Sequence, residues 1–561
     1  MRYTLTGLAA ALLAASALAA PAAPPERQAL AARTQSGGLP AALAEAPRYT
    51  LHLSDAKLSD KALRAALAKS VPEAKLRWRS RLWPELAIVE GPEGIATKLQ
   101  QTAGIGSVQT ARYTPSPASR STGKTTTATS GAKAAVRTKG AKAAEVPLSD
   151  DPQAGKDIRV GILSTGIDYT HAALGGAGTA AAYADALASA AAPYDGFPTS
   201  VVVGGTDFAA ESFNLSRDRN PLDSNLVYPV EGAYPTGRGT YLASIVHRLA
   251  PGAKLVALKA YAIFDDETNV RRVKYNLEDL AAAFEGALDP NQDGDTSDHV
   301  DVLLYDDSSG SFAYYNPGSD SPSGDSLITD MIQGVTARGI PVVAGSGELI
   351  YDSLYSIATA GSVPDAVTVG GIERVGTADA VAAFSGRGPV RGTAAFLKPD
   401  LVSDAVDISG ATVGSSTGSE TRTGLAAASA RVAAALAIVK QQRPALSGLE
   451  LKAALVNTGM RAIGQDAAHA TQAADVSRAG LGRENLAGAA ATPLLAWDED
   501  TRQPSMFVGF HEVVGSERYV RHLRIRNVST QDHSYALNVQ RIGDKPGFAA
   551  LGIEAPATVQ V

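Results

Sequence analysis

The sequence lacks the features that would assign it to several classes of protein. It contains no cysteine, so disulfide bonds cannot stabilise it, and burial of apolar side chains, with or without bound ions, must do so. No segment after residue 19 is apolar over the roughly 20 residues that span a bilayer, so no later membrane span is expected. The formal charge of -6 gives no electrostatic reason to expect a nucleic-acid partner.

What is present is typical of a globular protein with several domains. The chain has 561 residues, which is too many for one ordinary domain, and 45% of them are hydrophobic and 19% charged. Changes of pattern along the chain divide it into segments with the bounds 1–19, 47–114, 115–150, 151–491 and 492–561.

The first 19 residues predict a signal peptide. They begin with Arg2, continue through an apolar stretch at 8–18, and end in Ala-Leu-Ala at 17–19, the small-x-small pattern of a cleavage site. A membrane anchor is the alternative, and the shortness of the apolar run argues against it. We therefore expect export, to the periplasm or the extracellular space.

The next two segments differ sharply in composition. Residues 47–114 alternate extended and helical patterns, which predicts a small α+β unit. Residues 115–150 are rich in Ser, Thr, Ala, Gly and Lys and poor in anything that could build a core. They predict a disordered basic linker.

Residues 151–491 alternate short β-branched runs with helical stretches. The runs lie at 158–163, 254–259, 300–305, 341–345 and 366–370. This alternation predicts an α/β domain with a mostly parallel sheet and helices on both faces. Sites in such sheets form at the carboxyl ends of the strands, so functional residues are expected directly after these runs.

Seven motifs follow one another in this region. They are GILSTGIDYTH at 161–171, GRGTYLA at 237–243, APGAKL at 250–255, GIPVVAGS at 339–346, FSGRGP at 384–389, LKPDLV at 397–402 and TGLAAASA at 423–430. In content and order they resemble the segments of the secreted subtilisin-like serine peptidases, the subtilases. The resemblance covers nearly the whole chain and implies the subtilisin-like fold.

The resemblance also implies which residues stand at the family's catalytic positions. Ser164 takes the place of the catalytic aspartate, and Arg238 that of the histidine base. Ser346 takes the place of the asparagine that helps to form the oxyanion hole, and Ala426 that of the serine nucleophile. None of the four catalytic groups is therefore intact.

These substitutions remove the chemistry of peptide hydrolysis. The reaction needs a hydroxyl nucleophile, an imidazole base, a carboxylate that orients the base and a donor for the oxyanion. Alanine supplies no nucleophile, and a guanidinium stays protonated in proteins and cannot act as a base. Loss of the triad leaves only about 10³ to 10⁴ of acceleration over water. We predict a pseudopeptidase whose degenerate cleft binds a peptide or protein without cutting it.

Two other functions stay open. One is an active serine endopeptidase with an unrecognised nucleophile, for which Ser429, with His171 or His247, is the candidate. Ser429 lies almost one helical turn beyond Ala426, so the frame that positions an oxyanion would be misaimed. The other is a non-functional or structural surface paralogue, which poor secretion or instability would indicate.

The edge of the cleft also differs from the family. Where the family has a strand that ends in polar-Leu-Gly, this chain has LYDDSSG at 304–310, which places Asp306, Asp307 and Gly310 at the tentative cleft edge. The aspartates either form an ion pair with Arg238 or are solvated loop residues.

One segment has the opening of a calcium-binding loop. Its oxygen-bearing residues alternate as Asp289, Asn291, Asp293 and Asp295. Val300 stands at the twelfth position, where such loops have glutamate. The interpretations are a calcium site and an acidic surface turn, and no cofactor is required for the predicted function.

The two flanking regions also resemble parts of secreted subtilases. Residues 47–114 resemble the inhibitor prodomain, which normally blocks the cleft until it is cut off. An inactive protein could not release it by cutting itself, so the prodomain is an expected partner of the cleft. Residues 492–561 resemble the start of a fibronectin-like β-sandwich, and they are fewer than the about 100 residues of a complete one.

Overall fold

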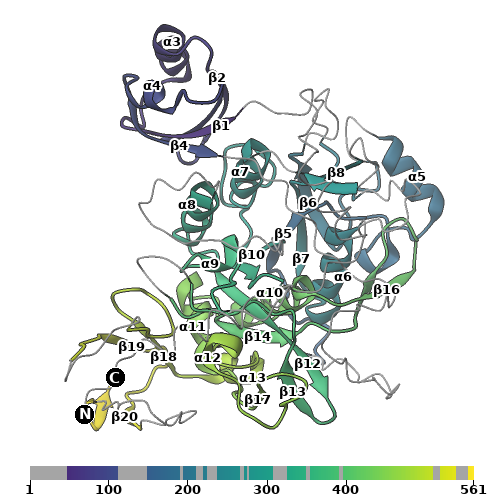
Figure 1. Cartoon of the computed structure of the whole chain (residues 1–561). Helices are drawn as coiled ribbons and strands as arrows, with labels where there is room; N and C mark the ends of the chain where they lie inside the picture. The colour runs from purple at the N-terminus through teal and green to yellow at the C-terminus, as the bar shows by residue number, and fades with distance from the viewer. Residues whose placement is uncertain are drawn as a thin grey trace, which may run out of the picture. The chain divides into compact units, whose positions relative to one another are not determined.

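The computed structural model describes most of the chain (Figure 1). The described residues are 47–111, 148–189, 194–209, 219–223, 237–265, 271–274, 277–306, 325–348, 354–390, 396–508, 518–538 and 554–561. The predicted signal peptide and nearly all of the predicted linker lie outside them. Within these ranges no helix is both long and apolar enough to cross a membrane.

Residues 48–111 form a small α+β unit. Its elements are β1 (Arg48–Leu53), α3 (Asp60–Ser70), β2 (Lys75–Arg79), β3 (Leu86–Glu90), α4 (Ala96–Gln100) and β4 (Ile105–Ala111). The strands pair antiparallel in the order β2-β3-β1-β4. Helix α3 begins where the Ser59 hydroxyl accepts a hydrogen bond from the Ala62 amide, and its Leu63 and Leu67 are buried against the sheet's apolar face.

A large, mostly parallel sheet forms the centre of the next region. Its strands are β5 (Arg159–Ser164), β6 (Val202–Asp207), β7 (Lys254–Lys259), β10 (Val302–Tyr305), β11 (Val342–Gly345), β12 (Val367–Val375), β13 (Ala378–Val381), β14 (Leu401–Asp404) and β17 (Ile463–Gly464). The order is β17-β13-β12-β11-β10-β5-β7-β6, with β14 paired to β12. Among these pairs only β12 and β13 run antiparallel. The predicted α/β class is confirmed.

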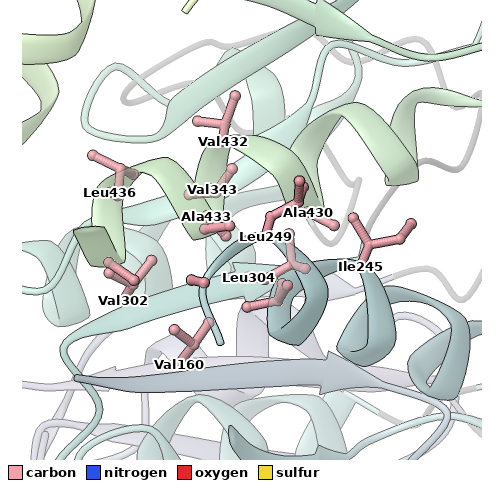
Figure 2. Packing of buried hydrophobic residues seen from close by; sticks show 14 of the residues in the cluster. Val160, Ile245, Leu249, Val302, Leu304, Val343, Ala430, Val432, Ala433 and Leu436 are labelled. Atoms are coloured by element: carbon pink, nitrogen blue, oxygen red, sulfur yellow. The ribbon is translucent and has the colours of Figure 1, made fainter. Parts of the chain in front are cut away.

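Helices cover both faces of this sheet. They are α5 (Ala180–Ala188), α6 (Arg238–Leu249), α7 (Leu277–Gly286), α8 (Asp325–Thr336), α9 (Thr359–Ser362), α10 (Leu425–Gln442), α11 (Gly448–Asn457), α12 (Val476–Ala479) and α13 (Leu486–Ala491), with a short 3₁₀ turn at Ala172–Leu174. Alternate strand residues point to opposite faces. Leu304 therefore packs in the cluster that contains α6 and α10, and Leu303 in the cluster that contains α7 and α8. Figure 2 shows Val432 and Leu436 of α10 packed with Val343 of the sheet.

Four pairs of short strands complete the described structure. They are β8 (Ala262–Asp265) with β9 (Arg271–Lys274), β15 (Ile408–Ala411) with β16 (Ser419–Arg422), β18 (Leu494–Asp498) with β19 (Leu523–Asn527), and β20 (Ser534–Ala536) with β21 (Thr558–Gln560). The last two pairs agree with the β pattern predicted for 492–561. The described residues of this region form no further strands, so they do not make a complete β-sandwich.

The small α+β unit contacts helix α7 through two carboxylates. The Glu278 carboxylate pairs with Arg48 at 3.3 Å. The Glu285 carboxylate accepts hydrogen bonds from the backbone amides of Arg81 at 2.9 Å and Leu82 at 3.1 Å. Both contacts join donors of the unit to acceptors of α7. Apolar packing adds to them, since Trp83, Leu86 and Ile88 of the unit belong to the same buried cluster as residues of α7 and α8.

A buried cluster of charges lies at the start of β14. The ammonium groups of Lys398 and Lys452 share the Asp400 carboxylate at 2.8 and 3.3 Å, and both donate to the carbonyl of Ala366 at 2.9 Å. All three charged side chains are almost fully buried. Burial lowers the pKa of Lys398 to about 7, although the Asp400 carboxylate opposes that change.

We expect Asp400→Asn to lower the free energy of unfolding by about 3–5 kcal/mol, because two buried ammonium groups would lose the carboxylate that they share. Urea unfolding followed by circular dichroism measures the change. The control is Asp185→Asn on the exposed face of α5, for which a change within about 0.5 kcal/mol is expected. Equal unfolding midpoints for the two variants would contradict the prediction.

Candidate functional site

The four predicted catalytic positions lie at ends of neighbouring elements. Ser164 is the last residue of β5, and Ser346 directly follows β11. Arg238 is the first residue of α6, and Ala426 is the second of α10. Strands β5, β10 and β11 are parallel neighbours, and α10 contacts all three as well as α6. The carboxyl ends of the strands and the two helix starts therefore meet at one edge of the sheet.

The Asp306 carboxylate, one residue beyond β10, connects two of these positions. It accepts hydrogen bonds from the Ser164 hydroxyl at 2.6 Å and from Arg238 through Nε at 2.9 Å and Nη2 at 2.5 Å. The Asp306 side chain is fully buried, whereas that of Arg238 is 19% exposed. Burial by itself would lower the pKa of the Arg238 guanidinium, but the Asp306 carboxylate raises it above its usual value. The arginine is therefore a permanent cation.

The ion pair proposed between Arg238 and the aspartates is present for Asp306. The other two residues of the tentative cleft edge, Asp307 and Gly310, lie outside the described residues. The positions predicted for the base and the carboxylate are thus occupied by two donors, Arg238 and Ser164, that converge on one acceptor.

Close packing and one buried carboxylate fix the start of α6. Gly239 must be glycine, because an added Cβ would lie 1.9 Å from the carbonyl oxygen of Gly166. The Asp223 carboxylate accepts hydrogen bonds from the backbone amide of Thr240 at 3.0 Å and from its hydroxyl at 2.7 Å. Asp223 thereby satisfies one of the amide donors that the first turn of a helix leaves free. Burial raises the pKa of Asp223 to about 7.

A second carboxylate lies at the start of α10. Glu348 follows β11 and accepts a hydrogen bond from the Leu425 amide at 3.0 Å. Gly424 makes room for it, since an added Cβ there would lie 2.6 Å from Oε1 of Glu348. Burial raises the pKa of Glu348, while the Leu425 amide and the charge of Arg238 oppose that rise. No motif in the sequence points to Glu348, although it stands two residues beyond Ser346, in the region after a strand where functional residues are expected.

Four residues at this edge of the sheet are partly exposed, and we call them the strand-end surface: Arg238, Glu348, Gly424 and Ala426. The Glu348 carboxylate binds the amide of Leu425, the first residue of α10, and Ala426 is the next residue of that helix. Its charged groups are one guanidinium already paired with a carboxylate, and a second carboxylate. This arrangement can bind polar ligands, but it holds no hydroxyl paired with a base.

Ser429 and the two histidines do not form such a pair either. Ser429 is almost fully buried on α10, and its hydroxyl has no hydrogen-bond partner among the described residues. His171 uses both ring nitrogens locally: Nδ1 accepts from the Ala173 amide at 3.1 Å and Nε2 donates to the Gly418 carbonyl at 3.0 Å. His247 lies near the far end of α6, where burial lowers its pKa.

The predicted calcium segment forms a turn that uses its own donors. The Asp289 carboxylate accepts hydrogen bonds from the Asp293 amide at 3.1 Å and the Gly294 amide at 3.0 Å. Asn291 donates to Asp293 at 2.9 Å, and Asp295 accepts from Ser297. In the described part of the chain no three His, Cys, Asp or Glu side chains are grouped to hold a metal ion. Calcium binding stays a prediction.

The sheet, its helices and the positions at its carboxyl edge define a subtilisin-like α/β protein. The chain belongs to the subtilase family: residues 155–485 match the family described as Peptidase_S8, Subtilase family. This confirms the family inferred from the motifs. No curated protein matches the chain.

Several solved structures are similar to the chain. One is fervidolysin from Fervidobacterium pennivorans, a keratinolytic enzyme related to subtilisin, with 16% identity and a TM-score of 0.48 over 82% of this chain and 62% of fervidolysin. Another is sphericase, with 19% identity and a TM-score of 0.40 over 59% of this chain and 92% of sphericase. A third is the S41 psychrophilic protease, with 19% identity and a TM-score of 0.41 over the same shares. The chain thus spans less than two thirds of the length of fervidolysin.

Arg238→His is expected to destabilise the fold by about 3–5 kcal/mol, because the imidazole cannot replace both guanidinium hydrogen bonds to buried Asp306. Thermal and urea unfolding measure the loss. Arg461→His, at an exposed position, is the matched control. An unchanged melting temperature in Arg238→His would show that the ion pair contributes nothing to stability.

The pH dependence of stability should carry a signature of Asp223. Its folded pKa of about 7 exceeds its ordinary 3.8, so between these values the native protein keeps a proton that the unfolded chain releases. This contribution to stability is present below about pH 4 and is lost as the pH rises through about 7, at about 1.4 kcal/mol for each pH unit between the two pKa values. The side chain in Asp223→Asn does not titrate. The free energy of unfolding of the Asp223→Asn protein, compared with that of the wild-type protein, should therefore rise between about pH 4 and about pH 7 and then level off. A difference between the two proteins that does not change with pH would contradict the prediction.

Proposed function

We propose that this subtilase-family chain is an exported pseudopeptidase, which binds a peptide or protein at the strand-end surface and does not hydrolyse it. The observation that carries the proposal is the Arg238–Asp306 pair at the start of α6. A protonated guanidinium held by two hydrogen bonds cannot take a proton from a nucleophile. No base is then present at this position to activate a hydroxyl nucleophile.

The start of α10 supports the same conclusion. Ala426 presents a methyl group at the position where the resemblance to the family predicts the nucleophile, so no acyl-enzyme can form there. The Glu348 carboxylate already accepts the hydrogen bond of the Leu425 amide. Hydrolysis needs donors aimed at a developing negative charge, whereas Glu348 adds a negative charge of its own. Both changes oppose catalysis independently of Arg238.

The mutual fit of Ser164, Arg238 and Asp306 argues against simple decay of this part of the site, whereas the buried Ser346 hydroxyl has no hydrogen-bond partner among the described residues. Random loss of a catalytic aspartate and histidine would leave buried polar groups unpaired, at a cost to stability. Here Ser164, Arg238 and Asp306 satisfy one another. Such agreement among neighbouring residues is expected where the site is maintained. This favours a binding function over the non-functional paralogue.

We also propose that the small α+β unit stays attached. In the active enzymes that the chain resembles, the peptidase itself removes the prodomain, and this chain would lack that activity. The contacts of Glu278 and Glu285 with the unit support a lasting association. Export and removal of residues 1–19 remain part of this proposal.

Labelling with a fluorophosphonate probe tests the proposed inactivity. The purified, folded protein should give no adduct by mass spectrometry, and Ala426→Ser should also give none, because Arg238 cannot act as the base. Ser429→Ala serves as the control variant for the buried hydroxyl.

A specific adduct at Ser429 that disappears in Ser429→Ala would restore the active-peptidase alternative. Binding is measured separately, by fluorescence anisotropy with pools of labelled peptides. Absence of both labelling and binding in a sample with a cooperative unfolding transition would leave the structural paralogue.

A further inference from the structure

Glu348 places a second carboxylate at the strand-end surface, beyond the one that Arg238 pairs with. Arg238 makes two hydrogen bonds to Asp306, so those two charges largely cancel. Glu348 receives one hydrogen bond, from the neutral Leu425 amide. Among the described residues no cationic side chain forms an ion pair with it. The described charges of Arg238, Asp306 and Glu348 therefore sum to one negative charge.

The Glu348 carboxylate is already partly removed from water. Desolvation is the main cause of its raised pKa, and it outweighs the opposing effects of the Leu425 amide and Arg238. The free protein therefore bears much of the desolvation cost that usually offsets the attraction between buried ions. A ligand that supplies a cation would gain that attraction at a smaller cost than at an exposed carboxylate.

The carboxylate remains within reach of a ligand. Glu348, Gly424 and Ala426 are all partly exposed. Gly424 has no side chain to cover Oε1, and an added Cβ there would lie 2.6 Å from this oxygen. Ala426 adds only a methyl group beside it. The small residues at the start of α10 thus leave room for a side chain that approaches Glu348.

We propose that Glu348 makes the strand-end surface selective for peptides that carry a lysine or arginine side chain. The inference rests on the proposed binding function and names the chemistry that the surface recognises. A neutral side chain would leave the carboxylate without a partner, and an acidic one would be repelled. A free peptide N-terminus carries the same ammonium chemistry, and the experiment separates the two sources.

The test compares three pools of fluorescent, N-acetylated and C-amidated decapeptides with lysine, norleucine or glutamate at the centre and uncharged residues elsewhere. Norleucine keeps the length of lysine and lacks its charge. A charge-assisted hydrogen bond contributes about 1.5–3 kcal/mol, so the lysine pool should bind the wild-type protein about tenfold more tightly than the norleucine pool, or better. The glutamate pool should bind most weakly.

Glu348→Gln should abolish this preference, so that the lysine and norleucine pools bind the variant with equal affinity, while the amide oxygen still accepts the hydrogen bond of Leu425. Glu73→Gln removes an exposed carboxylate of the small α+β unit and should keep the preference. The preference of the wild-type protein should also weaken with added salt, a measurement that needs no variant.

The outcomes separate this inference from the binding function. If no pool binds, both are wrong. If the pools bind equally, or Glu348→Gln keeps the lysine preference, the binding function stands and the role of Glu348 is wrong. A preference that appears only with unacetylated peptides would overturn the assignment to a side chain.

Discussion

The buried carboxylate of Asp306 is the group on which the arrangement of the strand-end surface depends. A carboxylate without exposure to water requires donors, and it receives them from β5 and α6, two elements that are distant in sequence. The same contacts hold the ends of β5 and β10 against the start of α6. The interaction on which the proposed inactivity rests is thus also one that keeps the site's geometry.

The scaffold around this carboxylate is that of the subtilase family, and it is held mainly by apolar packing. Helices α6 and α10 pack on one face of the parallel sheet, and α7 and α8 pack on the other. This packing is formed mainly by residues other than the predicted catalytic positions, so the fold does not depend on which chemistry they support. Polar constraints are concentrated at the helix starts, where Asp223 and Glu348 bind backbone amides.

Much of this could be predicted from the sequence, because it depends on local pattern. The β-branched runs predicted the parallel sheet, and the motifs predicted where Ser164, Arg238 and Ala426 would lie. The comparison with the family's strand that ends in polar-Leu-Gly indicated Asp306 as a residue of the cleft edge. Glu348 and Asp223 were missed because their partners are remote: Glu348 is 77 residues from Leu425, and no motif connects them. The sequence likewise could not decide whether Asp306 pairs with Arg238 or is a solvated loop residue, because that depends on which side chains are close in space.

The cluster of Lys398, Lys452 and Asp400 has a consequence for how the folded state can be followed. Its two ammonium groups are sequestered from water, and each is held by backbone carbonyls. Reagents that acylate amines reach such groups only when the surrounding structure opens. These two lysines are therefore built-in reporters of global opening, while the exposed lysines of the same chain record the reagent's activity.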